Sequence, residues 1–357
     1  MEVGILTFHW ATNYGAILQA YALQTYLQKM GHTVYIINYR PKWHKKNLLK
    51  CFYTKRFWLI PDNISEYLKE KKLEVFRKKY LNETALYESL DKLKKNPPDF
   101  DAYICGSDQI WNPWFTTCGE GKPTAVYFLD FGDQKVKKIA YAVSFGCITY
   151  PDAAAEFVKK YLSKFNHISV RENSGLEILS KLDFRCTFVL PDPTLLIDLS
   201  VYSFINLADK IKTKIAFEYI LRKENHIARK IENHIRQKYI ISKPNTIFKE
   251  YSMEEWVMRI KNAALVITNS YHGMIFSILS HVPFVVILSE GTASGMNDRF
   301  NTLLNQLELK NRAITKYDME QLNALLSQII NWDFIDNRLE ELRLESKKYF
   351  QKALSGY

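Results

Sequence analysis

Short apolar runs that alternate with helix-like segments are the feature that most constrains the fold of this chain. The runs are Val3–Phe8, Thr33–Asn38, Ala102–Cys105, Lys138–Val143, His167–Val170, Thr187–Leu190, Ile215–Ile220, Ala264–Ile267 and Pro283–Leu288. Such runs are typical of buried strands in a parallel sheet, because helices cover both faces of that sheet. Polar residues and glycines follow the runs, at the strand ends where α/β sheets bind ligands. The sequence therefore predicts an α/β fold.

The length of the chain predicts two domains. Its 357 residues exceed what one hydrophobic core normally holds, and the strand pattern starts again near residue 200. We expect an N-terminal Rossmann-like domain over residues 1–198 with an insertion at 42–98, and a C-terminal Rossmann-like domain over 199–335. A charged amphipathic helix over 336–357 is expected to pack back on the N-terminal domain. Other helices are predicted from Ala16 to Gly31, over Glu224–Gln237 and over Glu254–Asn262.

Composition excludes several classes of protein. With 47% hydrophobic and 24% charged residues the chain is neither disordered nor fibrous. No apolar run is long enough to span a bilayer, and Met1–Leu6 has the pattern of a strand rather than of a signal peptide, so we expect a cytoplasmic protein. The five cysteines are scattered without CxxC spacing, so we expect neither a disulfide framework nor a bound metal.

Positive charge is concentrated in the insertion. Residues 42–98 contain 15 Lys and Arg against 7 Asp and Glu, within a net charge of +11 for the chain. Aromatic residues alternate with these bases, as in Phe52–Ile60, which favours a membrane interface or a phosphorylated partner. A solvated helical insertion explains the charge equally well. Nucleic acid is disfavoured, because the segment is rich in apolar residues and contains no known reader motif.

The segment Thr268–Gly273 places a histidine where a strand ends and a helix begins. The apolar run Ala264–Ile267 precedes it, and the apolar face of a helix starts at Met274. A helix N-terminus offers free N–H groups and a partial positive charge, so an anion can bind there beside the imidazole of His272. The alternative is that Asn269 or Ser270 caps the helix and His272 fills space.

Several motifs together resemble the polysaccharide pyruvyl transferase family. They are Gly4–Thr7, Asn13–Ala16, Gln19–Leu23, Gly106–Asn112, Ser169–Glu172, Asp192–Leu195, Thr268–Gly273 and Pro283–Phe284. They occur in the family's order and extend from residue 3 to about residue 300. The basic insertion and the C-terminal tail lie outside the resemblance.

The resemblance implies a fold and a reaction. The fold would be GT-B-like, with two Rossmann-like domains facing a cleft, the N-terminal one on the acceptor side and the C-terminal one on the donor side. The reaction would transfer pyruvate from phosphoenolpyruvate to two hydroxyls of a sugar, forming a cyclic ketal for capsule or exopolysaccharide biosynthesis. The acceptor would be a lipid-linked or nucleotide-linked glycan, without a further cofactor. From the basic aromatic insertion, and not from the resemblance, we expect the cytoplasmic enzyme to contact the inner membrane face or the pyrophosphate of the acceptor.

The resemblance also implies donor-binding residues. Arg171 and His272 match the arginine and histidine that hold the donor, with Ser270 and Gly273 beside the histidine. Many relatives have an arginine where this chain has Ser270, and Arg299 is a candidate replacement for that cation. Alternatives from the residues themselves are that Arg171 pairs with Glu172 or a helix terminus, and that Arg299 pairs with Asp298.

The chemistry of ketal formation suggests further roles. Phosphoenolpyruvate needs several cations or N–H groups, an acid for its methylene carbon and a base for the sugar hydroxyl. His272 suits the acid or the phosphate ligand, and Asp108 suits the base, although it could instead cap a helix. The remaining acceptor-side candidates are Trp111 as an aromatic face for the sugar, Asn13, Tyr14 and Gly15 as lining residues, and His9 as a second acid or base. A structural role is the alternative for His9, and Asp192 is expected to stabilise a turn.

Two other functions fit the same sequence. The absence of arginine at Ser270 favours a GT-B glycosyltransferase that uses a nucleotide sugar. The basic surface also fits a non-catalytic scaffold of the polysaccharide assembly machinery.

Overall fold

The computed structural model describes residues 1–41, 48–52, 57–115, 124–185, 188–205, 214–221, 225–244 and 250–355. The chain divides into two compact units. Unit 1 comprises Met1–Lys45, Arg77–Ile197 and Glu340–Tyr357, and unit 2 comprises Lys46–Phe76 and Asp198–Leu339. The division near residue 198 lies where the strand pattern restarts, whereas most of the basic insertion belongs to unit 2 and not to the N-terminal unit that we expected.

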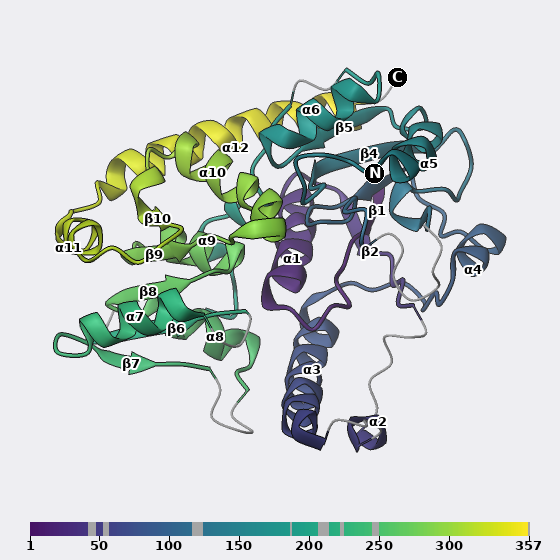
Figure 1. Cartoon of the computed structure of the whole chain (residues 1–357). Coiled ribbons are helices and arrows are strands. Elements are labelled where there is room, and N and C mark those ends of the chain that lie inside the picture. Colours follow the sequence, from purple (N-terminus) through teal and green to yellow (C-terminus); the bar gives the residue numbers. More distant parts are fainter. Residues whose placement is uncertain are drawn as a thin grey trace. The chain divides into compact units, whose positions relative to one another are not determined.

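Unit 1 is built on a parallel five-stranded sheet with the order β2-β1-β3-β4-β5 (Figure 1). The strands are β1 (Glu2–Leu6), β2 (Thr33–Ile36), β3 (Ala102–Cys105), β4 (Lys137–Val143) and β5 (His167–Val170). Its helices are α1 (Tyr14–Lys29), α4 (Leu90–Lys95), α5 (Asp152–Leu162) and α6 (Asn173–Lys181). The central strand β3 is buried along its whole length, as expected for a sheet covered on both faces.

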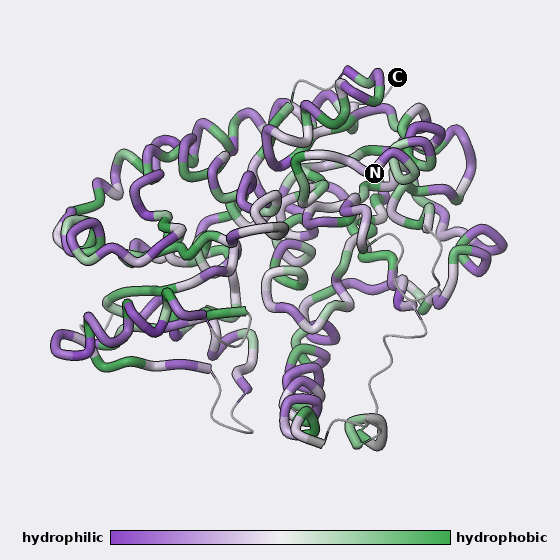
Figure 2. The backbone as a smooth tube through the Cα atoms, in the orientation of Figure 1, coloured by the Kyte–Doolittle hydropathy of each residue, from purple (hydrophilic) through white to green (hydrophobic). Residues whose placement is uncertain are grey.

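The second half of the C-terminal helix α12 (Trp332–Leu354) completes the core of unit 1. The Phe350 ring stacks on Tyr141 of β4 with 4.5 Å between centroids, and the Tyr349 hydroxyl donates to the Ala140 carbonyl at 2.8 Å. Figure 2 shows hydrophilic and hydrophobic residues alternating along this helix, the pattern of an amphipathic helix with one buried face.

Unit 2 repeats the same architecture, with the sheet order β10-β9-β8-β6-β7 and all pairs parallel. The strands are β6 (Ile215–Tyr219), β7 (Ile240–Ser242), β8 (Leu265–Thr268), β9 (Phe284–Ile287) and β10 (Ala313–Ile314). The helices are α7 (His226–Ile235), α8 (Met253–Lys261), α9 (Tyr271–Leu279), α10 (Asp298–Gln306), α11 (Met319–Ser327) and the start of α12. Short 3-10 helices include η3 (Val126–Phe128), η4 (Pro193–Leu195) and η6 (Gly291–Asn297).

The two sheets have equivalent strand orders, which fixes where each unit can bind a ligand. In each, the first strand in sequence lies between the second and the third. The connections that follow β1 and β3 therefore run toward opposite edges of the sheet in unit 1. Those that follow β6 and β8 do the same in unit 2. Ligands of open α/β sheets bind at the carboxyl ends of such a strand pair.

The basic insertion forms helices α2 (Leu48–Phe52) and α3 (Ile60–Tyr80). Leu73 and Phe76 of α3 are buried, and Phe76 packs edge-to-face on Phe204 at 4.9 Å. The Lys72 ammonium donates to the Glu250 carbonyl at 2.6 Å. This part of α3 is thus an element of unit 2 with one buried face, while Lys71, Lys78 and Lys79 are exposed, as a helical insertion with solvated lysines requires.

Two predictions about strands differ from the structure. Of the expected strand Thr187–Leu190, Thr187 lies outside the described residues, and Val189 forms only an isolated bridge to Val170. The short strands β7 and β10 were not predicted, because two or three residues give no recognisable apolar pattern. Among the described residues no helix is both long and apolar enough to cross a membrane.

Candidate functional site

The N-terminus of α9 lies at the carboxyl ends of β6 and β8, the ligand-binding position of unit 2. The Thr268 hydroxyl donates to the Tyr219 carbonyl at 2.7 Å, which links the two strand ends. The Asn269 side chain accepts from the Leu221 N–H at 2.8 Å and links the loops that follow them. The Ser270 hydroxyl caps α9 by accepting from the Gly273 N–H at 3.2 Å. The predicted strand, turn and helix are therefore present, with the cap on Ser270.

Gly273 is required by close packing rather than by backbone torsion. A Cβ atom at this position would lie 2.6 Å from the Thr268 hydroxyl oxygen, a distance that real Cβ atoms do not reach. Thr268 cannot move away easily, because its hydroxyl also accepts from the Ser270 N–H at 3.0 Å. Gly273 thus lets α9 start directly against the end of β8.

His272 and Arg299 both pack against the ring of Tyr271. The His272 and Tyr271 rings are 5.6 Å apart and edge-to-face, and the Arg299 guanidinium carbon is 5.5 Å from the Tyr271 ring centroid. His272 is buried but for 7% of its surface. Arg299 also contacts the Phe300 ring at 5.3 Å. An imidazole, a guanidinium and a helix N-terminus therefore belong to one local group, which is suited to an anion.

Unit 1 has its own polar group at the carboxyl ends of β3, β4 and β5. Asp108 follows β3 with a φ of 80°, and its carboxylate accepts from the Gln109 N–H at 2.9 Å. A non-glycine residue with this torsion is held by its surroundings at a cost in free energy, a feature that recurs at functional sites. The Asp108 side chain is 16% exposed, so part of it can be reached from solvent.

Arg171, at the end of β5, is surrounded by carboxylates. Its guanidinium donates to Asp192 at 2.7 Å and lies 3.6 Å from an Asp108 oxygen and 3.8 Å from a Glu172 oxygen. The Arg171 side chain is fully buried. Its positive charge is thus compensated inside the protein. The alternative pairing with Glu172 is present as part of a group of three carboxylates around the guanidinium. Asp192 also caps η4 by accepting from the Thr194 N–H at 3.0 Å, as expected of a turn-stabilising residue.

Glu172 connects the loops around Asp108. It accepts from the Phe145 N–H at 3.0 Å and so holds the turn that contains Gly146. Gly146 has a φ of 63°, and a Cβ atom there would lie 2.2 Å from the Gln109 side-chain oxygen. Glu172 was not among the predicted site residues, because a buried carboxylate that binds backbone N–H groups has no sequence signature.

The predicted acceptor-side residues Asn13, Tyr14 and Gly15 form the start of α1. Asn13 caps the helix by accepting from the Gly15 N–H at 2.9 Å and the Ala16 N–H at 3.4 Å. Tyr14 is 1% exposed and Gly15 is buried. Only part of Asn13 is therefore available for contact with a ligand.

His9 is a structural residue. It is fully buried, with one ring nitrogen 3.2 Å from the Thr7 carbonyl and the other 3.4 Å from the Asn38 side-chain oxygen. Burial, reinforced by the charge of Arg40, lowers the pKa of His9 to about 3. The imidazole is neutral at physiological pH and not accessible, so the prediction of a second catalytic acid at this position is wrong.

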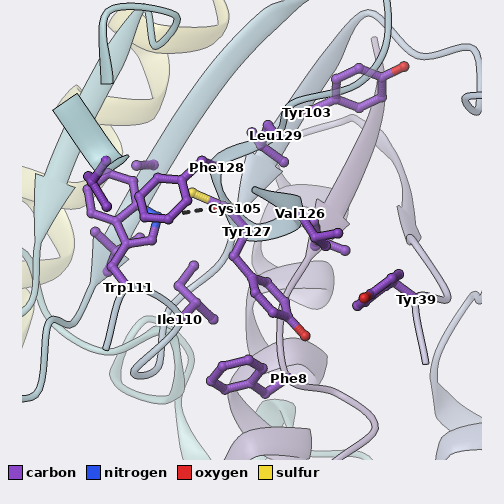
Figure 3. Close-up of a cluster of buried hydrophobic side chains, with 14 of the residues drawn as sticks. Phe8, Tyr39, Tyr103, Cys105, Ile110, Trp111, Val126, Tyr127, Phe128 and Leu129 are labelled. Atoms are coloured by element: carbon purple, nitrogen blue, oxygen red, sulfur yellow. Dashed lines mark hydrogen bonds between the residues drawn. The ribbon is translucent and has the colours of Figure 1, made fainter. Parts of the chain in front are cut away.

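Trp111 is also a core residue. It is 0% exposed, its ring stacks on Phe128 at 5.2 Å, and its indole N–H donates to the Tyr127 carbonyl at 3.0 Å (Figure 3). A side chain enclosed by aromatic rings cannot offer a face to a sugar. The prediction that Trp111 binds the acceptor is therefore wrong, because its indole is buried in the apolar cluster of unit 1.

Comparison with known proteins identifies the chain's family. A sequence model of the polysaccharide pyruvyl transferases matches residues 13–291, which include every predicted site residue except His9 and Arg299. The chain belongs to the polysaccharide pyruvyl transferase family. It is thus a member of an enzyme family of polysaccharide biosynthesis, for which a polysaccharide acceptor is implied. No curated protein matches this pyruvyl transferase family member in sequence.

One solved structure, with a TM-score above 0.5, supports the fold of this family member, and two others are similar at lower scores. A protein from Listeria monocytogenes assigned as a UDP-N-acetylglucosamine 2-epimerase has a TM-score of 0.53 at 10% identity, covering 100% of this chain and 98% of that one. A spinosyn rhamnosyltransferase has a TM-score of 0.45 at 10% identity, with coverages of 98% and 96%. UDP-GlcNAc 2-epimerase from Neisseria meningitidis has 0.44 at 12% identity, with 98% and 100%. The fold of two Rossmann-like units is GT-B-like.

No cluster of metal-binding side chains occurs among the residues that the structure describes for this pyruvyl transferase family member. Within the same residues, Cys51, Cys105 and Cys147 are buried thiols that form no disulfide.

Proposed function

We propose that this protein transfers pyruvate from phosphoenolpyruvate to a sugar diol, and that the N-terminus of α9 binds the donor. The group of His272, Arg299 and the α9 N-terminus carries this proposal, because it combines an imidazole and a guanidinium with backbone N–H groups at the carboxyl ends of β6 and β8, where sheets of this kind bind ligands. A phosphate with a neighbouring carboxylate needs such a combination. In this proposal Arg299 provides the cation that many relatives obtain from an arginine at the position of Ser270.

The roles follow from the reaction. The methylene carbon of the donor gains a proton, a sugar hydroxyl forms a bond to the adjacent carbon, the bond from that carbon to the phosphate oxygen breaks, and the second hydroxyl closes the ketal. Of the two hydroxyl protons, one balances the new methyl group and the other leaves with phosphate. We assign His272 as the acid and Asp108 as the base. The reaction transfers no electrons to a cofactor, so we propose none.

Arg171 receives a different role in this proposal. Because Asp192, Asp108 and Glu172 already surround its guanidinium, it orients the Asp108 loop. Direct contact between Arg171 and the donor stays a prediction. Arg171 and His272 belong to different units.

Calorimetry separates this proposal from the glycosyltransferase alternative. Phosphoenolpyruvate should bind to the wild type, whereas UDP-glucose and UDP-galactose should not. His272→Ala should weaken the binding of phosphoenolpyruvate on the order of ten-fold or more, since a charge-assisted contact is lost. His226→Ala is the control, because His226 is an exposed histidine in the first turn of another unit 2 helix. Binding of a nucleotide sugar but not of phosphoenolpyruvate favours the glycosyltransferase.

We further propose that the inserted segment contacts an anionic membrane surface, where a lipid-linked acceptor would be found. Leu48, Phe52 and Trp58 are 43%, 53% and 72% exposed, in the segment that carries most of the net positive charge of the chain. Apolar side chains among bases suit a headgroup interface. Phe52→Ala combined with Trp58→Ala should reduce cosedimentation with phosphatidylglycerol vesicles, while Trp114→Ala should not. Unchanged cosedimentation of the double variant contradicts the membrane role.

A further inference from the structure

An exposed aromatic pair follows Asp108 in the same turn. Trp114 is 61% exposed and Phe115 is 39% exposed, three and four residues after the buried Trp111. The turn is held by two hydrogen bonds from Asn112, which accepts from the Trp114 N–H through its side chain and from the Phe115 N–H through its carbonyl, both at 3.0 Å. The position of the pair is therefore fixed by the fold.

The pair continues an aromatic cluster at the carboxyl ends of β1 and β3. Phe115 packs edge-to-face on Phe8 with 6.1 Å between centroids. Phe8 follows β1 and packs on Tyr127 at 4.7 Å, as Figure 3 shows. The Tyr127 hydroxyl accepts from the Trp10 indole N–H at 3.0 Å. Since this is the ligand-binding position of unit 1, the exposed rings lie where a substrate of that unit is expected.

We propose that Trp114, supported by Phe115, is the platform for a sugar ring of the acceptor glycan. The C–H groups on one face of a sugar carry a small positive charge and suit the negative face of an indole ring. Stacking by this face leaves the hydroxyls at the edge of the sugar ring accessible. The reaction requires this, because the donor carbon must form bonds to two of these hydroxyls. Asp108, in the same turn, has a partly accessible side chain whose carboxylate would receive a hydroxyl proton. The inference rests on the proposed function and names the acceptor subsite within it.

Saccharide binding tests the platform without any turnover. The probes are methyl β-galactoside, methyl α-mannoside and their disaccharides, followed by saturation-transfer NMR and titration. Trp114→Ala should weaken the binding of at least one probe about ten-fold, and Trp114→Phe should weaken it less, because a ring face remains. Trp58→Ala is the matched control, since Trp58 is an exposed tryptophan of unit 2. Equal affinities of wild type and Trp114→Ala, or no binding of any probe to the wild type, overturn the platform.

Kinetics separate this inference from the proposed function. With phosphoenolpyruvate as donor, Trp114→Ala should raise the KM for the saccharide and leave the KM for phosphoenolpyruvate unchanged. A loss of saccharide binding in a protein that never consumes phosphoenolpyruvate refutes the pyruvyl donor and supports the platform. A rise in the KM for phosphoenolpyruvate alone refutes the platform. Sedimentation velocity completes the test, because a monomer–dimer change in Trp114→Ala means that a second copy of the chain covers Trp114.

Discussion

At the scale of single residues, substitutions of Ser270 can test the stability of α9 and its capacity to bind an anion independently. Ser270→Ala removes the helix cap and should lower the free energy of unfolding by about 1 kcal/mol. Ser270→Asn and Ser270→Asp both keep a cap, but the aspartate adds a negative charge beside the proposed phosphate position. Both should unfold like the wild type in urea, while only Ser270→Asp should lose affinity for phosphoenolpyruvate in calorimetry. Equal affinities of these two variants contradict the donor position.

The pKa of His9 predicts a dependence of stability on pH. The folded protein lowers this pKa from 6.5 to about 3 because His9 is buried. Between these values only the unfolded chain binds the proton, so stability falls as the pH decreases through this range. The contribution is at most about 1.4 kcal/mol per pH unit. His9→Gln should show a shallower loss of unfolding free energy between pH 6.5 and pH 4 in urea titrations, and identical slopes contradict the assignment.

At the scale of elements, α12 is a structural part of unit 1 rather than a tail. Phe350 is fully buried against Tyr141 and lies 5.7 Å from the Tyr26 ring. Phe350→Ala should lower the free energy of unfolding by about 3–5 kcal/mol, since a large cavity remains. Leu344→Ala in the same helix is the control, because Leu344 is 52% exposed. Equal effects of the two substitutions in chemical denaturation disagree with this packing.

The elements that the sequence predicted correctly are those with strong periodicity. The expected helices over Glu254–Asn262 and over 336–357 correspond to α8 and α12, and the strand before His272 is β8. Side-chain direction was less predictable. Trp111 and Trp114 have the same chemistry and lie in one turn, yet the structure buries the first and exposes the second. Which one faces solvent depends on packing against Phe128, a contact distant in sequence.

At the scale of the whole molecule, two units with equivalent strand orders each present polar side chains at the carboxyl ends of their strands, at β3, β4 and β5 in unit 1 and at β6 and β8 in unit 2. His272 and Arg299 belong to unit 2, and Asp108 with Arg171 belongs to unit 1. The sequence indicated these residues as candidates, because each except Arg299 follows an apolar run that is typical of a strand. Arg299 instead follows a glycine-containing loop. The sequence offered the pairing of Arg171 with Glu172 as an alternative, but it did not predict the contacts with Asp192 and Asp108, because these two residues approach Arg171 only in the folded unit.

The most direct test of the central claim is the release of inorganic phosphate from phosphoenolpyruvate with the full chain and galactose-type or mannose-type acceptors. We predict release that depends on an acceptor, that is lost in His272→Ala and that persists in His226→Ala. Product mass should increase by one pyruvic acid minus one water. No release with any acceptor, or the same rate in His272→Ala as in the wild type, would contradict the claim that the N-terminus of α9 binds and activates an enol phosphate.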